Sequence, residues 1–199
     1  MTTGTDPLAL IDMDGTLADY DASMKRELEK LRAPGEPEFP YTAHEGNPPW
    51  LEARRGLIAR QPGFWRNLSP IPGGFQVVEV MEDIGFQIHI LTKAPSNKPA
   101  AWMEKVEWCR QYLPSAAITV TEDKTNYYGR VLFDDWPPYY MGWLRHRKRG
   151  LVIVPAQPWN EGKTDHPNII RWDGQNIDRI RAALVTVRDR ADKEPLQLP

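Results

Sequence analysis

Cysteine is almost absent from this 199-residue chain, and long apolar runs are absent altogether. The single cysteine, Cys109, excludes an intrachain disulfide framework and is typical of a reducing cytoplasm, where we expect the protein to reside. No apolar stretch approaches the roughly 18 residues that a membrane-spanning helix requires, and we expect no secretory signal and no membrane association. Histidine is also scarce, and the four histidines show no metal-ligand spacing.

The chain also lacks a dominant sign of charge. A formal net charge of −2 gives no general attraction to nucleic acid or to a membrane surface. One basic cluster, Arg145–Arg149, stands out before Gly150. We interpret it as a solvated helix end, because cations near a helix C-terminus interact favourably with the helix dipole. The alternative is a contact with a phosphate backbone. Hydrophobic residues make up 41% of the chain, which is compatible with a packed core.

The most informative segment is Ile11–Tyr20, which follows the short apolar run of a buried strand. Two carboxylates, Asp12 and Asp14, stand where that strand ends, and Gly15 allows a sharp turn directly after them. Ligands of open α/β sheets bind in the crevice beyond the carboxyl ends of the strands. Because two acids there repel each other, we expect a divalent cation between them, which together with a carboxylate nucleophile indicates phosphoryl chemistry.

Three later segments add the other groups that this chemistry needs. Phe86–Thr92 reads as a strand that delivers the hydroxyl of Thr92 at its end. Lys124 supplies a compact positive charge. The strand before Asp134 and Asp135 delivers a second acid pair. The order of acid pair, hydroxyl, lysine and acid pair is much harder to obtain by chance than any one of its parts.

These segments carry a family resemblance. Asp12–Leu17, with the sequence DMDGTL, resembles the first motif of the haloacid dehalogenase superfamily. Within it, the closest likeness is to the 5′(3′)-deoxyribonucleotidases, carried also by Gly63–Gly73 (GFWRNLSPIPG) and by Thr121–Thr125 (TEDKT) before the second acid pair. The likeness runs from about residue 8 to about residue 160. It departs from the family at Lys93, where a small hydroxyl residue is usual, and in a short proline-rich insert.

The resemblance implies a role for each motif residue. Asp12 is the nucleophile and Asp14 the general acid and base, while Thr92 and Lys124 hold the phosphoryl group. It also implies a magnesium ion held by the following residues: Asp12, the Asp14 carbonyl, Asp135, and Asp134 either directly or through water. Lys93 becomes a candidate for phosphate or base recognition.

Strand and helix patterns alternate along the chain, which predicts an α/β fold with a Rossmann-like parallel sheet covered by helices on both faces. We expect a haloacid dehalogenase-like core at residues 1–19 and 72–190, a small inserted helical cap at residues 20–71, and a loose tail at residues 191–199. The cap is expected to exclude water and to contact the leaving group.

The cap holds several aromatic residues that could stack on a nucleobase. For Trp50 we favour a place in a miniature core of the cap, whereas Phe64 and Trp65 serve equally well as core or as substrate-binding residues. Helical spacing predicts inward-facing residues in four helices, one in the cap and three in the catalytic core. They are Met24, Leu28 and Leu31 in the cap helix 23–31; Phe75, Val78, Met81 and Ile84 in 73–84; Trp102, Val106, Cys109 and Leu113 in a helix capped by Ser96 or Asn97; and Ile180, Leu184 and Val187 in 178–188.

The sequence therefore predicts a magnesium-dependent phosphomonoesterase that acts on (deoxy)nucleoside monophosphates through an aspartyl-phosphate. One alternative is a phosphatase for another small phosphoester or for a 3′-phosphate at a nucleic-acid end. A more remote alternative is a noncatalytic binding module. A polymeric nucleic acid is not the expected partner, and the family likeness makes a homodimer an expectation.

Overall fold

The structure is a computed structural model that describes residues 7–44, 46–191 and 194–198. Six parallel strands form one sheet in the order β3-β2-β1-β4-β5-β6. The strands are β1 (Leu8–Ile11), β2 (Gln87–Thr92), β3 (Ala117–Val120), β4 (Val131–Phe133), β5 (Leu151–Pro155) and β6 (Ile169–Trp172). The helices are α1 (Tyr20–Glu29), α2 (Pro49–Ile58), α3 (Pro72–Ile84), α4 (Pro99–Tyr112), α5 (Pro137–His146) and α6 (Ile177–Asp189).

Helices cover both faces of this sheet, as the alternation of patterns predicts. On one face the side chains of Ala9 and Ile11 pack in a core with buried residues of α3, α4 and α6. On the other, Leu10 packs with buried aromatic and leucine side chains of α5. Successive residues of a strand point to opposite faces, so the four-residue strand β1 contributes to both cores. The predicted α/β fold class is confirmed.

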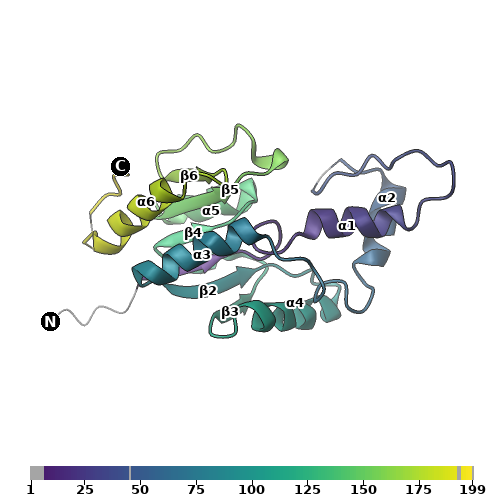
Figure 1. Ribbon diagram of the computed structural model, residues 1–199, viewed down its shortest axis with the longest axis horizontal. Helices are drawn as coiled ribbons and strands as arrows, with labels where there is room; N and C mark the ends of the chain where they lie inside the picture. The colour runs from purple at the N-terminus through teal and green to yellow at the C-terminus, as the bar shows by residue number, and fades with distance from the viewer. Residues whose placement is uncertain (1–6, 45, 192–193, 199) are drawn as a thin grey trace.

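The chain leaves the sheet between β1 and α3. This segment contains α1 and α2, which lie beyond the carboxyl ends of the strands (Figure 1). Helix α1 begins at Tyr20, with the Asp19 side chain capping the amide of Ala22 at 3.0 Å. That start is earlier than the predicted residue 23, and Leu31, predicted to face inward, lies after the helix and is 44% exposed. Trp50 is also exposed, packed edge-to-face on Phe39.

The predictions for the remaining helices hold in part. Helices α3 and α6 bury most of the predicted stripes; of α5 only the end at the basic cluster was predicted, and β6 was not predicted. Helix α4 begins at Pro99 after Lys98, with no side-chain cap, so neither Ser96 nor Asn97 caps it. The expected loose tail falls partly on residues 192, 193 and 199, which lie outside the described residues; Leu196 and Leu198 pack against the core. Among the described residues, no helix combines the length and apolarity needed to cross a bilayer.

Cys109 gives a direct test of this packing. Its side chain is fully buried in α4, and burial raises the pKa of the thiol to about 12. Because the thiolate is the reactive form, we expect the native protein to resist a disulfide reagent such as dithionitrobenzoate and to react stoichiometrically in denaturant. Rapid labelling of the native protein would contradict the buried position.

Candidate active site

Three carboxylates meet where the strand order changes direction. Strand β1 lies between β2 and β4, and Asp12 follows β1 while Asp134 and Asp135 follow β4. The Asp12 amide donates to the carbonyl of Phe133 at 2.8 Å, which extends the pairing of the two strands to the site. One oxygen from each of the three carboxylates lies within 4.8 Å of the others, and all three side chains are buried. This is the switch point at which ligands of open α/β sheets bind.

Lys124 is the cation closest to this cluster. It begins the 3₁₀ turn η1 (Lys124–Asn126), and its Nζ lies 2.6 Å from Asp12 Oδ1 and 2.7 Å from Asp134 Oδ2. Burial by itself would lower the pKa of Lys124, but the two carboxylates raise it above the ordinary value, so the side chain stays charged. One ammonium group therefore faces three carboxylates.

Two of the buried acids have raised pKa values. Burial raises the pKa of Asp134 to about 6, against the opposing effect of Lys124. Burial and repulsion by Asp12 and Asp134 raise the pKa of Asp135 well above its usual range. A hard divalent cation prefers oxygen ligands of this kind and would relieve the repulsion. The donor set thus fits a metal ion.

Asp135 is held by contacts on several sides. Trp159 Nε1 donates to Asp135 Oδ2 at 2.9 Å, and Asn160 Nδ2 donates to its backbone carbonyl at 3.0 Å. The turn after β1 passes against the same carboxylate, because Gly15 adopts a φ of 75° and a Cβ at that position would lie 2.3 Å from Asp135 Oδ2. Gly15 is therefore needed for two reasons, its positive φ and the close approach of Asp135.

Asp14 belongs to a second charged group. Its carboxylate forms a short ion pair with Lys105 of α4, whose Nζ also donates to Thr92 Oγ1 at 3.1 Å and to the carbonyl of Lys93 at 2.5 Å. Lys105 thereby ties the acid after β1 to the hydroxyl at the end of β2. Burial raises the pKa of Asp14, Lys105 opposes this rise, and Asp12 adds to it. Asp14 Oδ1 has no hydrogen-bond partner among the described residues.

Lys105 was missed by the sequence analysis. The predicted stripe of α4 was right for Cys109 and Leu113, but Trp102 and Val106 are only half-buried, and the buried face carries Glu104 and Lys105 instead. A helix pattern treats charged residues as solvent-facing. The sequence offers one indication, a Glu–Lys pair at helical spacing from the apolar residues Ala101, Trp108 and Cys109. It does not reveal the partner of the lysine, because Asp14 lies 91 positions away.

A cavity of about 350 Å³ opens above the carboxylates. The sheet side contributes acids, a lysine and aromatic rings: Asp12, Asp14, Lys93, Pro95, Asp135, Trp136 and Tyr139. The segment between β1 and α3 contributes the opposite wall: Tyr20, Ala43, His44, Arg55 and Trp65. The cavity thus combines a charged floor with largely aromatic walls.

The predicted substrate-binding residues occupy different places around this cavity. Trp65 lines it, stacked on Tyr20 with ring centroids 5.3 Å apart, and the Lys105 ammonium lies 4.8 Å from the Trp65 ring. Phe64 lies behind, edge-on to both rings and almost fully buried. Lys93 lines the cavity with its Nζ 5.6 Å from the Tyr139 ring.

Buried Glu104 fixes the turn that presents Trp65. Its two carboxylate oxygens accept hydrogen bonds from the amides of Gly63 at 2.6 Å and Trp65 at 3.1 Å. The indole Nε1 of Trp65 donates to the carbonyl of Ala59 at 3.0 Å. Helix α4 therefore positions both Asp14, through Lys105, and the aromatic wall, through Glu104.

His44 and Arg55 are two cavity residues that the sequence analysis did not select. His44 stacks on Trp136 with centroids 3.6 Å apart, and burial and Arg55 lower its pKa to about 4, which keeps the imidazole neutral. Arg55 donates to the carbonyl of Ala43 at 2.9 Å. Neither residue lies in a recognisable motif, and both reach the cavity only because the chain between β1 and α3 folds back over the strand ends.

Comparison with known proteins shows which proteins the chain resembles. A family model described as 5′ nucleotidase, deoxy (pyrimidine), cytosolic type C protein matches residues 6–184. The chain is similar to the human 5′(3′)-deoxyribonucleotidase of cytosolic type, with 34% identity over 149 residues that cover 63% of this chain and 69% of the human protein.

Solved structures share the fold at much lower identity. One is a haloacid dehalogenase-like hydrolase from Xanthomonas campestris, with a TM-score of 0.53 and 14% identity over 92% of this chain and 96% of the other. Another is a hydrolase of the same superfamily from Deinococcus radiodurans, with a TM-score of 0.53 and 12% identity over 94% and 99%. The chain therefore belongs to the cytosolic type C 5′-deoxynucleotidase family, it shares the fold of haloacid dehalogenase-like hydrolases, and it is a phosphoric monoester hydrolase.

Proposed function

We propose that this protein is a magnesium-dependent phosphomonoesterase that hydrolyses deoxynucleoside monophosphates through a phosphorylated Asp12. The observation that carries the proposal is the cavity that has Asp12, Asp14 and Asp135 in its floor and aromatic rings in its walls. The floor provides the groups for phosphoryl transfer, and the walls are suited to a nucleobase. The name of the human relative supports the deoxynucleotide class.

In the proposed reaction Asp12 attacks phosphorus and forms a bond to it while the bond to the ester oxygen breaks. Asp14 gives its proton to the departing oxygen, then takes a proton from the water that attacks the phosphoryl group, which releases phosphate and restores Asp12. Lys124, 2.6 Å from Asp12, would neutralise charge on the nucleophile and on the phosphoryl oxygens. Thr92 would donate a hydrogen bond to the same oxygens.

The side chains of Asp12 and Asp135, with the carbonyl of Asp14, would hold the magnesium ion. Both oxygens of Asp134 are already engaged, Oδ2 by Lys124 at 2.7 Å and Oδ1 by the Trp136 amide at 2.9 Å. We therefore assign Asp134 to a contact through water. When bound, the ion would offset the negative charge of the carboxylates and of the phosphate.

The segment of residues 20–71 would act as the cap in this scheme. It supplies Tyr20, His44, Arg55 and Trp65 to the cavity wall, opposite the acids. Trp65 and its stacked neighbour Tyr20 offer a face for the base, whereas Phe64 would support them from behind. Arg55 and Lys93 place positive charge at the cavity for the phosphate or for polar groups of the base.

Phosphate release from a panel of substrates tests the proposal. The panel contains ribo- and deoxyribonucleoside monophosphates with 5′ or 3′ phosphates, sugar phosphates and 3′-phosphorylated oligonucleotides, each with and without magnesium. We expect magnesium-dependent release concentrated on the deoxynucleotides. Equal turnover of sugar phosphates would remove the nucleotide assignment but keep the reaction class. Binding of nucleotides without turnover would leave only the binding module.

Replacement of Lys105 tests how Asp14 is held. Lys105→Met removes the partner of Asp14 and of Thr92, so the acid loses its position as proton donor. General acid catalysis contributes about 10²- to 10⁴-fold, and we expect a loss of kcat in this range for nucleotides, whose alcohol oxygen is a poor leaving group.

The leaving group of p-nitrophenyl phosphate needs no general acid, so for this substrate we expect kcat to fall by no more than about tenfold. Lys30→Met, at an exposed lysine that directly follows α1 and pairs with Glu27, is the matched control and should leave both rates unchanged. Equal losses of both substrates in Lys105→Met would contradict a role through Asp14.

A further inference from the structure

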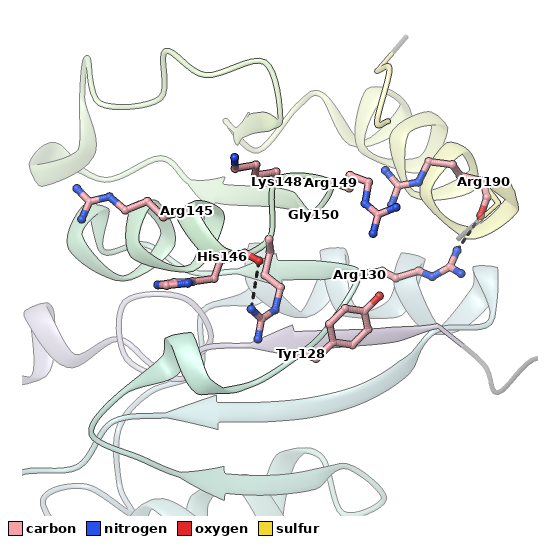
Figure 2. Close-up of a pocket in the computed structure, with 10 residues that line it drawn as sticks. Tyr128, Arg130, Arg145, His146, Lys148, Arg149, Gly150 and Arg190 are labelled. Atoms are coloured by element: carbon pink, nitrogen blue, oxygen red, sulfur yellow. Dashed lines mark hydrogen bonds between the residues drawn. The ribbon is translucent and has the colours of Figure 1, made fainter. Parts of the chain in front are cut away.

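A second cavity lies at the opposite end of the sheet from the carboxylates. It has a volume of about 280 Å³ and lies beside the residues that precede β4 and β5. Figure 2 shows that its labelled residues come from three places: the segment before β4, the end of α5 with the turn that leads to β5, and the residue that follows α6. Six lysine and arginine residues line it: Arg130, Arg145, Arg147, Lys148, Arg149 and Arg190.

This basic pocket contrasts with the rest of the molecule. No carboxylate is found among the described residues that line it, although the whole chain carries a formal net charge of −2. The pocket includes the basic cluster that the sequence analysis interpreted as a solvated helix end. Arg130 of the pocket directly precedes β4, and Asp134 directly follows the same strand. At the usual rise per residue of a strand, these two residues are about 13 Å apart. The cluster therefore does not face a substrate bound at the carboxylates.

Part of the positive charge is held in place by the fold. Arg130 donates to the carbonyls of Val187 and Arg190, both at 3.0 Å, and so caps the end of α6. Arg147 donates to the carbonyl of Thr125 at 3.2 Å. These carbonyl contacts fix the direction of two guanidinium groups of the pocket, those of Arg130 and Arg147.

Two guanidinium nitrogens in the pocket are buried without any partner among the described residues. They are Arg147 Nε and Arg190 Nη1. Burial and the neighbouring charges of Arg130 and Arg149 lower the pKa of Arg190, against smaller opposing effects of Tyr128 and Glu194. Buried donors without a partner are destabilising. A bound anion would accept hydrogen bonds from them and would offset the positive charge of the pocket.

An aromatic ring stands at the rim of the same pocket. Tyr128 is 67% exposed, and the guanidinium carbon of Arg147 lies 5.7 Å from its ring centroid. Figure 2 shows the Tyr128 ring among the guanidinium groups of the pocket. An exposed ring beside phosphate-binding groups is a surface on which a nucleobase can stack.

We propose that the basic pocket is a second, noncatalytic site that binds a nucleoside triphosphate, with its phosphates among the arginines and its base against Tyr128. The cations converge on one hollow instead of extending along a face, which suits a short polyphosphate better than the backbone of a nucleic acid. The volume accommodates the phosphate chain and leaves the base at the rim. This site is independent of the reaction proposed above.

Equilibrium binding of dATP and of inorganic tripolyphosphate at fixed salt tests the proposal. The test variant, Lys148→Gln with Arg190→Gln, removes two of the six positive charges and leaves Arg130 and Arg147 in their structural contacts. The control, Arg26→Gln with Arg179→Gln, removes two exposed charges from α1 and α6 outside the pocket. Tyr128→Ala tests the rim.

We expect the test variant to bind both ligands at least tenfold more weakly than wild type, and the control to bind them as wild type does. Tyr128→Ala should weaken dATP about fivefold or more and leave tripolyphosphate unchanged. Release of phosphate from deoxynucleoside monophosphates, measured without triphosphate, should be unchanged in all of these variants.

Three results would overturn the assignment. The first is equal loss in the test and control variants. The second is binding that survives in the test variant but disappears in Trp65→Ala, which would place the ligand in the catalytic cavity. The third is tighter binding of a single-stranded oligonucleotide of about twelve residues than of dATP, which would make the pocket part of a nucleic-acid surface.

Discussion

Asp12→Asn is expected to abolish phosphate release while the protein stays folded. Asp12 is the carboxylate that lies 2.6 Å from Lys124 at the end of β1, and an amide oxygen is a far weaker nucleophile. We expect kcat to fall by at least about four orders of magnitude, as when a nucleophile is removed from other enzymes that form covalent intermediates. Phosphate release from a deoxynucleoside monophosphate measures the effect.

Stability gives a second measurement on the same variant. Three buried carboxylates face one ammonium group, so a neutral side chain at position 12 removes repulsion from Asp134 and Asp135 while Lys124 keeps its contact with Asp134. Without metal, we expect Tm to be unchanged or higher than in wild type. Magnesium should raise the Tm of wild type much more than that of the variant, because a ligand stabilises the state that binds it.

The control is Asp19→Asn, seven residues further along the chain. Asp19 caps α1 through its side chain, and asparagine caps helices equally well, so activity and Tm should be unchanged. Phosphate release by Asp12→Asn at even a few per cent of the wild-type rate would remove Asp12 as the nucleophile. A large fall in Tm would instead indicate that the contact with Lys124 is mainly structural.

The meeting of these acids was predictable because the strands that carry them are parallel. Short apolar runs before Asp12 and Asp134, and before Thr92, are strong strand patterns, and the carboxyl ends of parallel strands lie at one edge of the sheet. Local sequence therefore placed each group on a strand end, and topology brought them together. The positions of these strand-end residues could be predicted without knowing the path of the connecting loops.

Lys105 and His44 show where this reasoning stops. The inward face of α4 is defined by contacts of Lys105 with Asp14 and of Glu104 with the amide of Trp65, which lie far apart in sequence. Helical periodicity is read from apolar residues, so a charged inward face is assigned to solvent. His44 reaches Trp136 through a loop with no regular period, and its position depends on the whole path of the chain between β1 and α3.

The two ends of the sheet have opposite electrostatic character, and this separates their chemistry. Buried carboxylates gather at the carboxyl ends of the strands, where they need a cation. Arginines gather at the amino ends of β4 and β5, where two buried donors lack an acceptor among the residues that the structure describes. A ligand that supplies a cation at the first end, or an acceptor for the two donors at the second, would stabilise the folded protein. Strand β4 separates the two clusters by only three residues.

Gly15→Ala is expected to impair both stability and catalysis, although the change adds a single methyl group. Gly15 has a φ of 75°, and its added Cβ would lie 2.3 Å from Asp135 Oδ2. The backbone conformation alone costs an L-residue about 1–2 kcal/mol. The contact forces either the turn after β1 or Asp135 to move, and Trp159 and Asn160 hold Asp135 from the other side.

Gly35→Ala separates the two effects. Gly35 has a φ of 81° but no atom within 4 Å of the added Cβ, so it carries the same conformational cost without the contact. We expect Gly35→Ala to lose about 1–2 kcal/mol of unfolding free energy and no activity. Gly15→Ala should lose more stability than this and at least about 100-fold in kcat, because a displacement near 1 Å in a catalytic group has effects of that size.

The dependence on magnesium then distinguishes a displaced site from a destabilised fold. If Asp135 moves, Gly15→Ala should require a higher magnesium concentration for half-maximal activity, measured at a temperature where the protein is fully folded. Gly35→Ala should keep the wild-type requirement. An activity loss in Gly15→Ala that follows only the fraction unfolded, with an unchanged magnesium requirement, would show that the close approach of Gly15 to Asp135 has no part in forming the metal site.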